Sequence, residues 1–170
     1  MDDKAAVLSG VSARTRRLNV FVKVSGDEYL NPLFQKWIRD MSTRSWVVIC
    51  IGGGTQINAE FDCLGIVTTF GPLGREILEF GHKQIARDVL ERNKIELEDE
   101  LAKNGIHVTV CIPVREVGEV LCHENGDQMV RSVYLGFDKL YVVTTPERLE
   151  KKKTEFTELP KVEVKVFASS

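Results

Sequence analysis

The chain has 170 residues, of which 43% are hydrophobic and 28% are charged, and its formal net charge is −2. This profile argues against a disordered chain, and the charge argues against a broad electrostatic surface for nucleic acid. Because the N-terminus is acidic and no apolar run reaches about 20 residues, we expect neither a secretion signal nor a membrane span, and hence a cytoplasmic protein without nucleic-acid or membrane partners.

The length suits one hydrophobic core. Residues 1–15 are polar and small and predict a flexible arm, which leaves residues 16–170 as a single domain. The four cysteines are widely spaced and form no CxxC pair, so we expect buried, reduced thiols. The three histidines share no ligand spacing, and we therefore expect no metal site.

Strand and helix patterns alternate in the first half of the domain. Residues 17–24 predict a buried strand, and the Asn-Pro pair that follows favours a helix start. Residues 32–42 carry apolar side chains at helical spacing. Residues 46–51 form an unbroken apolar run, typical of a strand covered on both faces, and the run ends in Gly52 to Gly54. The helix positions expected in the core are Leu33, Phe34, Trp37, Ile38 and Met41.

The same alternation continues in the second half. Residues 73–104 predict a bent helix or two helical pieces, ended by a left-handed Gly105. Its expected core positions are Ala86, Val89, Leu90, Ile95, Leu97 and Leu101. Further strands are predicted at residues 106–113, 139–145 and 162–167, the last at a sheet edge, with a helix at 125–136 and a charged, exposed segment at 146–155. This order predicts an α/β fold, a three-layer α/β/α sandwich with a mainly parallel sheet.

Three unusual segments, "KVSGD", "GGGTQ" and "ENGDQ", border these predicted strands. Ligands of parallel α/β sheets bind beyond the carboxyl ends of the strands. The loop from Gly52 to Gly54 precedes a helix, so its backbone N–H groups could bind a phosphate or carboxylate, although such loops also occur for turn geometry alone. Lys23 could extend to solvent, or it could neutralise the charge of a phosphoryl group beside the glycines.

Two further residues are candidates for the same site. Asp127 could help to cap the helix that follows, a task for which Asn125 is equally suitable, or its carboxylate could orient Lys23. Arg75 lies in a segment expected to determine specificity, and its planar guanidinium suits a carboxylate or phosphate. A solvated surface arginine is the alternative reading of Arg75.

Together the three segments resemble the amino acid kinase superfamily, which includes acetylglutamate kinase and bacterial uridylate kinase. "KVSGDEYL" is similar to the uridylate kinase opening, "VVICIGGGTQIN" to the second strand and glycine loop, and "ENGDQMVRSVYLGFDKLYVVTT" to the Asn-x-Asp helix and the next strand. The resemblance covers about residues 17–145 and implies a carbamate kinase-like fold, with ATP and magnesium as cofactors. It implies catalytic roles for Lys23 and Asp127, and phosphate or substrate binding by Ser25, Gly26, Gly52, Gly53, Gly54, Arg75 and Asn125.

The chain departs from that family after residue 145, where a charged segment replaces the expected nucleotide lobe. Two functions are therefore expected as alternatives. One is a phosphotransferase that moves the γ-phosphoryl group of ATP to a nucleoside monophosphate or similar acceptor. The other is a non-catalytic domain that binds a small anion or assembles subunits. Lys151 to Lys153 are either surface lysines or a substitute for a missing family lysine. In both cases we expect a small anionic ligand and a homo-oligomer, with residues 73–104 in its contact.

Overall fold

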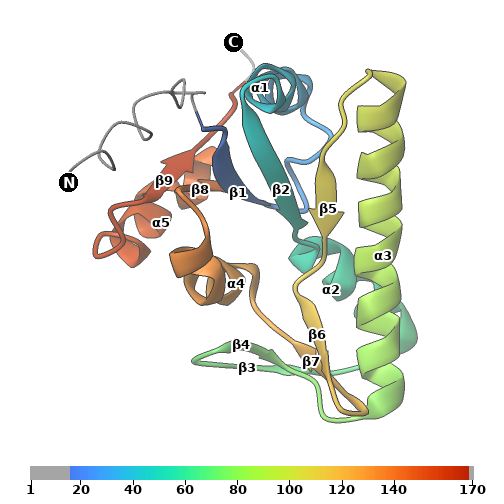
Figure 1. Cartoon of the computed structure of the whole chain (residues 1–170). Helices are drawn as coiled ribbons and strands as arrows, with labels where there is room; N and C mark the ends of the chain where they lie inside the picture. The colour runs from blue at the N-terminus through green and yellow to red at the C-terminus, as the bar shows by residue number, and fades with distance from the viewer. Residues whose placement is uncertain (1–15, 169–170) are drawn as a thin grey trace, which may run out of the picture.

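The computed structural model describes residues 16–168, so the predicted arm at residues 1–15 lies outside the described residues. A five-stranded sheet forms the centre, in the order β5-β2-β1-β8-β9, and all four of its strand pairs are parallel (Figure 1). Its strands are β1 (Leu18–Val24), β2 (Ser45–Ile51), β5 (Thr109–Cys111), β8 (Lys139–Val143) and β9 (Val162–Lys165). The predicted edge position of the last strand is confirmed.

Helices cover both faces of the sheet, which confirms the predicted α/β/α sandwich. The helices are α1 (Pro32–Ser42), α2 (Gly54–Leu64), α3 (Phe80–Lys103), α4 (Gly126–Val133) and α5 (Leu149–Glu155), with short 3₁₀ turns at Tyr134–Gly136 and Pro146–Arg148. Buried side chains of α1 and α3 pack with one face of β1 and β2. Val130 of α4 and Phe156 after α5 pack against the other face. One hydrophobic core therefore lies on each face of the sheet.

Two antiparallel hairpins that the sequence patterns did not predict lie beyond the sheet. They consist of β3 (Thr69–Gly71) with β4 (Gly74–Glu76), and β6 (Val114–Val117) with β7 (Val120–His123). The expectation of helix from residue 73 onward is therefore wrong for its first turns. Gly74 has φ of +122°, which only glycine adopts readily, and this breaks any helix there. Helix α3 begins at Phe80 and is a single helix.

The predicted core positions are largely correct, with three exceptions at exposed apolar side chains. Leu33 in α1 and Ile95 in α3 are 44% and 55% exposed, because their positions on the helices turn their side chains toward solvent. Trp46 of β2 is 62% exposed, so this strand is not covered on both faces at its start. The guanidinium of Arg17 lies 5.0 Å from the centre of the Trp46 ring. The exposed indole is therefore partly covered by a cation.

The sequence predicted a charged, exposed segment at residues 146–155. The structure shows that this segment is partly buried. It folds as a 3₁₀ turn and α5, and the Lys152 side chain in this segment is only 12% exposed.

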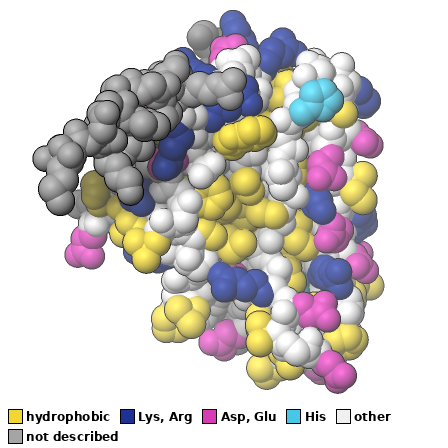
Figure 2. All heavy atoms as spheres, viewed as in Figure 1, with side chains coloured by type: hydrophobic (Ala, Val, Ile, Leu, Met, Phe, Trp, Pro, Cys, Tyr) yellow, Lys and Arg dark blue, Asp and Glu magenta, His cyan; other side chains and the backbone are white. Residues whose placement is uncertain are grey.

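Figure 2 shows acidic and basic side chains mixed along the α3 side of the molecule, with apolar side chains toward the centre of the same face. In the span 16–168, no helix is long and apolar enough to cross a membrane.

The neighbours Leu97 and Ile95 on α3 allow a direct test of the core. Leu97 is fully buried and packs against the sheet, whereas Ile95 is 55% exposed. Leu97→Ala should lower the free energy of unfolding by about 2–5 kcal/mol through lost burial and a residual cavity. The control, Ile95→Ala, should cost less than about 1 kcal/mol. Urea unfolding followed by circular dichroism measures both, and equal losses would contradict the described phase of α3.

Candidate functional site

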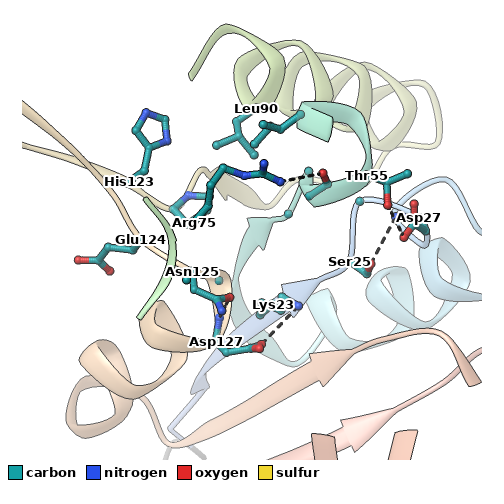
Figure 3. A pocket seen from close by; sticks show the side chains of 18 of the residues that line it. Lys23, Ser25, Asp27, Thr55, Arg75, Leu90, His123, Glu124, Asn125 and Asp127 are labelled. Carbon is teal, nitrogen blue, oxygen red and sulfur yellow. Dashed lines mark hydrogen bonds and ion pairs between the residues drawn. The ribbon is translucent and has the colours of Figure 1, made fainter. Parts of the chain in front are cut away.

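One cavity of about 480 Å³ lies where β1, β2 and β8 end. Figure 3 shows side chains from β1, the β3–β4 hairpin and the start of α4 directed toward it. The structure brings all the site residues predicted from the sequence to its lining, although their roles stay predictions. These residues are Lys23, Ser25, Gly26, Gly52, Gly53, Gly54, Arg75, Asn125 and Asp127.

Close backbone packing forms the floor of this cavity. The N–H of Gly52 donates to the carbonyl of Val24 at 2.8 Å, which ties the glycine loop to the end of β1. A Cβ added to Gly26 would lie 2.9 Å from the Cα of Gly53 and 2.4 Å from Oε1 of Gln56. The turn after β1 and the glycine loop are therefore in backbone contact, and a side chain at Gly26 would force them apart.

A buried carboxylate joins two lysines at one side of the cavity. Asp127 Oδ1 lies 3.4 Å from Lys23 Nζ, and Lys152 Nζ donates to Asp127 Oδ2 at 2.5 Å. The three side chains are only 12–13% exposed. Lys152 also donates to Glu155 Oε2 at 2.6 Å, which holds its ammonium in place. Both lysines and Asp127 line the cavity, so two ammonium groups meet there around one carboxylate.

The helix cap at α4 separates the two roles considered for Asp127. The side chain of Asn125 accepts from the backbone N–H of Asp127 at 3.1 Å, so Asn125 is the N-cap. Asp127 is then free to bind the two lysines through its side chain. Burial by itself raises the pKa of Asp127, but Lys23 and Lys152 outweigh it and lower that pKa below its ordinary value. The carboxylate is therefore charged at neutral pH.

The sequence analysis did not distinguish Lys152 from Lys151 and Lys153. Its ammonium is desolvated, which lowers its pKa, but the carboxylates of Asp127 and Glu155 outweigh this and raise the pKa above its ordinary value. Lys151 and Lys153, its neighbours, are 76% and 52% exposed in their side chains. Only the phase of the short helix α5 distinguishes the three lysines. In the sequence they form one undifferentiated run.

Arg75 lies on the opposite side of the cavity and is half-buried, whereas one reading of the sequence was a solvated surface arginine. It stacks 4.6 Å from the centre of the Phe70 ring and donates to Thr68 Oγ1 at 2.9 Å and to Asn58 Oδ1. Burial lowers the pKa of Arg75, with an opposing effect of Asp62. Its hydrogen-bond acceptors within the described residues are all uncharged: Thr68, Asn58 and the Gly54 carbonyl. Among residues 16–168, no carboxylate forms an ion pair with Arg75.

Apolar side chains form much of the wall near Arg75, and the sequence patterns did not indicate this. Figure 3 shows Leu90 beside Arg75, across the cavity from Lys23 and Asp127. The apolar lining residues are Ile57, Phe70, Ile77, Leu90 and Pro113. Several of them lie on or beside the unpredicted hairpins, which explains why the wall was missed. The cavity thus has a charged side and an apolar side.

His123 completes the wall on β7 but is not arranged to bind an anion. Its Nε2 lies 2.9 Å from the carbonyl of Lys83, so that atom already has a partner. Burial lowers the pKa of His123, with smaller effects of nearby groups, and this favours the neutral ring at neutral pH. Throughout residues 16–168, no three His, Cys, Asp or Glu side chains are grouped to hold a metal ion.

Comparisons with known proteins show a likeness to solved structures. No family model and no curated protein matches the sequence. Among solved structures, the fold is similar to N-acetylglutamate synthase from Neisseria gonorrhoeae complexed with coenzyme A and L-arginine, with a TM-score of 0.52 and 11% identity. The likeness covers 76% of this chain and 45% of that chain, so this protein spans less than half the length of its neighbour. At this identity the likeness shows the fold alone.

These findings correct the family expected from the sequence. Membership of the amino acid kinase superfamily, with uridylate kinase as its nearest branch, is wrong, because no family model supports it and the structural neighbour described above is an N-acetylglutamate synthase. ATP and magnesium as cofactors are wrong for the same reason, since the neighbour holds coenzyme A and L-arginine. A lysine ending a strand, a glycine loop before a helix and an Asn cap suit many parallel sheets, so these short motifs indicate a fold and a pocket.

Asp127→Asn should make the free energy of unfolding less dependent on pH in the acidic range. In the unsubstituted chain, the stability contributed by Asp127 is complete above its ordinary pKa of 3.8 and is lost as pH falls through the lower folded-state value. At neutral pH the substitution leaves two buried ammonium groups without their shared carboxylate and should cost about 3 kcal/mol.

Thermal and urea unfolding between pH 2 and pH 7 measure this difference. The control, Glu150→Gln, changes a side chain that is 82% exposed and should shift stability at neutral pH by less than about 0.5 kcal/mol. An unchanged stability of Asp127→Asn at neutral pH, or an unchanged acid limb, would show that the ion pairs do not hold the fold.

Proposed function

We propose that this chain binds a small organic anion, a phosphate monoester or carboxylate with an apolar body, as a non-catalytic ligand-binding domain. The observation that carries the proposal is the charge of the cavity lining. Five lysine and arginine side chains line it against three aspartate and glutamate side chains, an excess of two positive charges. The protein as a whole has a net charge of −2, so this local excess opposes the overall sign.

The charged side of the cavity supplies the donors for an anionic group. Lys23 and Lys152 are already oriented by Asp127, so an anion does not have to order two flexible side chains when it binds. Beside them, α2 begins at Gly54 without a side-chain hydrogen bond at its N-cap. Its first N–H groups therefore remain available, and the helix dipole favours a negative charge at this end.

The apolar side of the cavity limits which anions fit well. Its wall carries Ile57, Ile77 and Leu90, and burial of apolar surface contributes about 25 cal/mol per Å². The volume of about 480 Å³ is within the range of sites for small molecules. Inorganic phosphate would leave this wall in water, whereas an organic phosphate or carboxylate would cover it. Coenzyme A and L-arginine belong to the neighbour, and the ligand class proposed here rests on this cavity.

The partner and location expected from the sequence also stay proposals. A homo-oligomer and a cytoplasmic location would both be compatible with a domain that binds a small metabolite-sized anion. Neither is needed for the ligand site, which consists of residues from one chain.

Calorimetric titration with three probes tests the proposed ligand class. Phenyl phosphate carries both features, inorganic phosphate only the charge, and benzyl alcohol only the apolar ring. We expect phenyl phosphate to bind at least about tenfold more tightly than inorganic phosphate, a difference of about 1.4 kcal/mol. Benzyl alcohol should not bind measurably. The affinity for phenyl phosphate should fall at high salt because screening weakens the partly exposed charges. Equal binding of benzyl alcohol and phenyl phosphate would contradict an anion site.

A matched pair of variants on α5 locates the site. Lys152→Gln removes an ammonium group at the cavity and should weaken phenyl phosphate binding by about 10- to 100-fold, the worth of one charge-assisted hydrogen bond. Lys153→Gln removes the same charge from a side chain that is 52% exposed and pairs with Glu150, and it should leave affinity within about twofold. Equal losses in both variants would indicate only a general effect of net charge.

A further inference from the structure

Two cysteines lie side by side on neighbouring strands near the cavity. Strand β2 lies between β1 and β5 (Figure 1). The register of β2 and β5 sets Cys50 opposite Cys111, and that of β1 and β2 sets Lys23 opposite Cys50. Opposed residues of a parallel pair project from the same face of the sheet. Both cysteines accordingly pack in the core cluster that contains Val130 of α4. Lys23, Cys50 and Cys111 thus form one row across three strands.

The spacing of this row suits a bond between the two sulfur atoms. Neighbouring strands lie about 4.7–4.9 Å apart, and the Cα atoms of a disulfide are about 4.4–6.8 Å apart. Both thiols are free. The other two cysteines have no such partner, since Cys63 is exposed on α2 and Cys122 pairs in register with Arg115 on the second hairpin.

The two thiols differ in accessibility and in acidity. Cys50 is fully buried, whereas Cys111 on the short edge strand is half-buried. The neighbouring Cys50 thiol lowers the pKa of Cys111, and this outweighs the effect of burial. The same contact, together with burial, raises the pKa of Cys50. Cys111 is therefore the thiol that an external reagent meets first, and Cys50 is the thiol placed to attack second.

We propose that Cys50 and Cys111 form a thiol–disulfide exchange site that reacts with a small-molecule disulfide. The thiolate of Cys111 attacks one sulfur of the small disulfide, which releases one small thiolate and leaves a mixed disulfide on Cys111. The Cys50 sulfur then attacks the Cys111 sulfur, and the Cys50 proton passes to the small thiolate as it leaves. This step breaks the mixed disulfide, forms the Cys50–Cys111 bond and releases the second small molecule as a thiol. The cysteines lose two electrons, and the small disulfide gains them.

The position of the bond gives this site a connection to the cavity. Gly52 and Pro113 line the cavity, and each follows its cysteine by two residues. The bond would join β2 and β5 immediately before both segments. The proposal does not depend on the identity of the ligand, because it concerns only the two thiols and the strands that carry them.

Peptide mapping after treatment with oxidised glutathione tests the site. The folded chain is incubated with excess oxidised glutathione, blocked with N-ethylmaleimide and cut without reduction by trypsin and a protease that cleaves after glutamate. Cleavage after Glu60 separates Cys50 from Cys63, so each cysteine lies on its own peptide. We expect a cross-linked pair of the Cys50 and Cys111 peptides, lighter by two hydrogen atoms than their sum and released by dithiothreitol, in most of the molecules.

Two single variants and a denatured sample complete the test. Cys111→Ser should abolish the cross-link and leave Cys50 as an unmodified thiol, whereas the matched control Cys122→Ser should keep the cross-link. In urea all four cysteines should form mixed pairs, which separates a specific reaction of the fold from random oxidation. A stable glutathione adduct on Cys111 without the cross-link, or equal cross-links among all cysteines in the folded chain, would overturn the proposal. The mapping of the unsubstituted chain is decisive even if a variant does not fold.

Discussion

The carboxylate of Asp127 is the contact on which the arrangement of this domain depends. It joins Lys23 at the end of β1 to Lys152 of α5, two residues that are 129 positions apart in the sequence. None of the three side chains is more than 13% exposed, so each charge needs the others to compensate for lost hydration. The interaction therefore fixes the C-terminal segment against the central strand, and by the same contacts it orients two cations at one cavity. Stability and site geometry share these atoms.

Much of this fold could be predicted because the spacing of apolar residues and the order of strands and helices can be recognised in the sequence. The apolar run of β2 and the stripe of α1 gave their elements almost to the residue, and parallel strands bring their following loops together. The two hairpins could not be predicted, since strands of three or four residues show no alternation that distinguishes them from loops. Lys152 was hidden for a different reason. In a run of three lysines, only the phase of a seven-residue helix determines which one turns inward.

The incorrect family assignment has a physical explanation in the same contacts. The glycines at Gly26 and Gly52 permit two loops to touch, Asn125 caps a helix, and Lys23 is the next-to-last residue of β1. Each of these features helps to form a pocket at the end of a parallel sheet. Their order along the chain therefore indicates the geometry of the pocket more than the family of the protein. The specificity of the pocket lies instead in its wall, to which the hairpins contribute Phe70 and Arg75. Short sequence motifs do not indicate this part of the pocket.

The central position of β1 also governs when this chain can fold during synthesis. Its first partner, β2, follows soon, but Val20 pairs on its other side with Lys139, 119 residues later. Until the ribosome has released that distant segment, one edge of an apolar strand has no backbone partner. Closing so long a loop is slow compared with local helix formation, and an unpaired apolar edge promotes association with other chains. Production of this protein should therefore be sensitive to chaperone supply and to any pause in translation between residues 51 and 139.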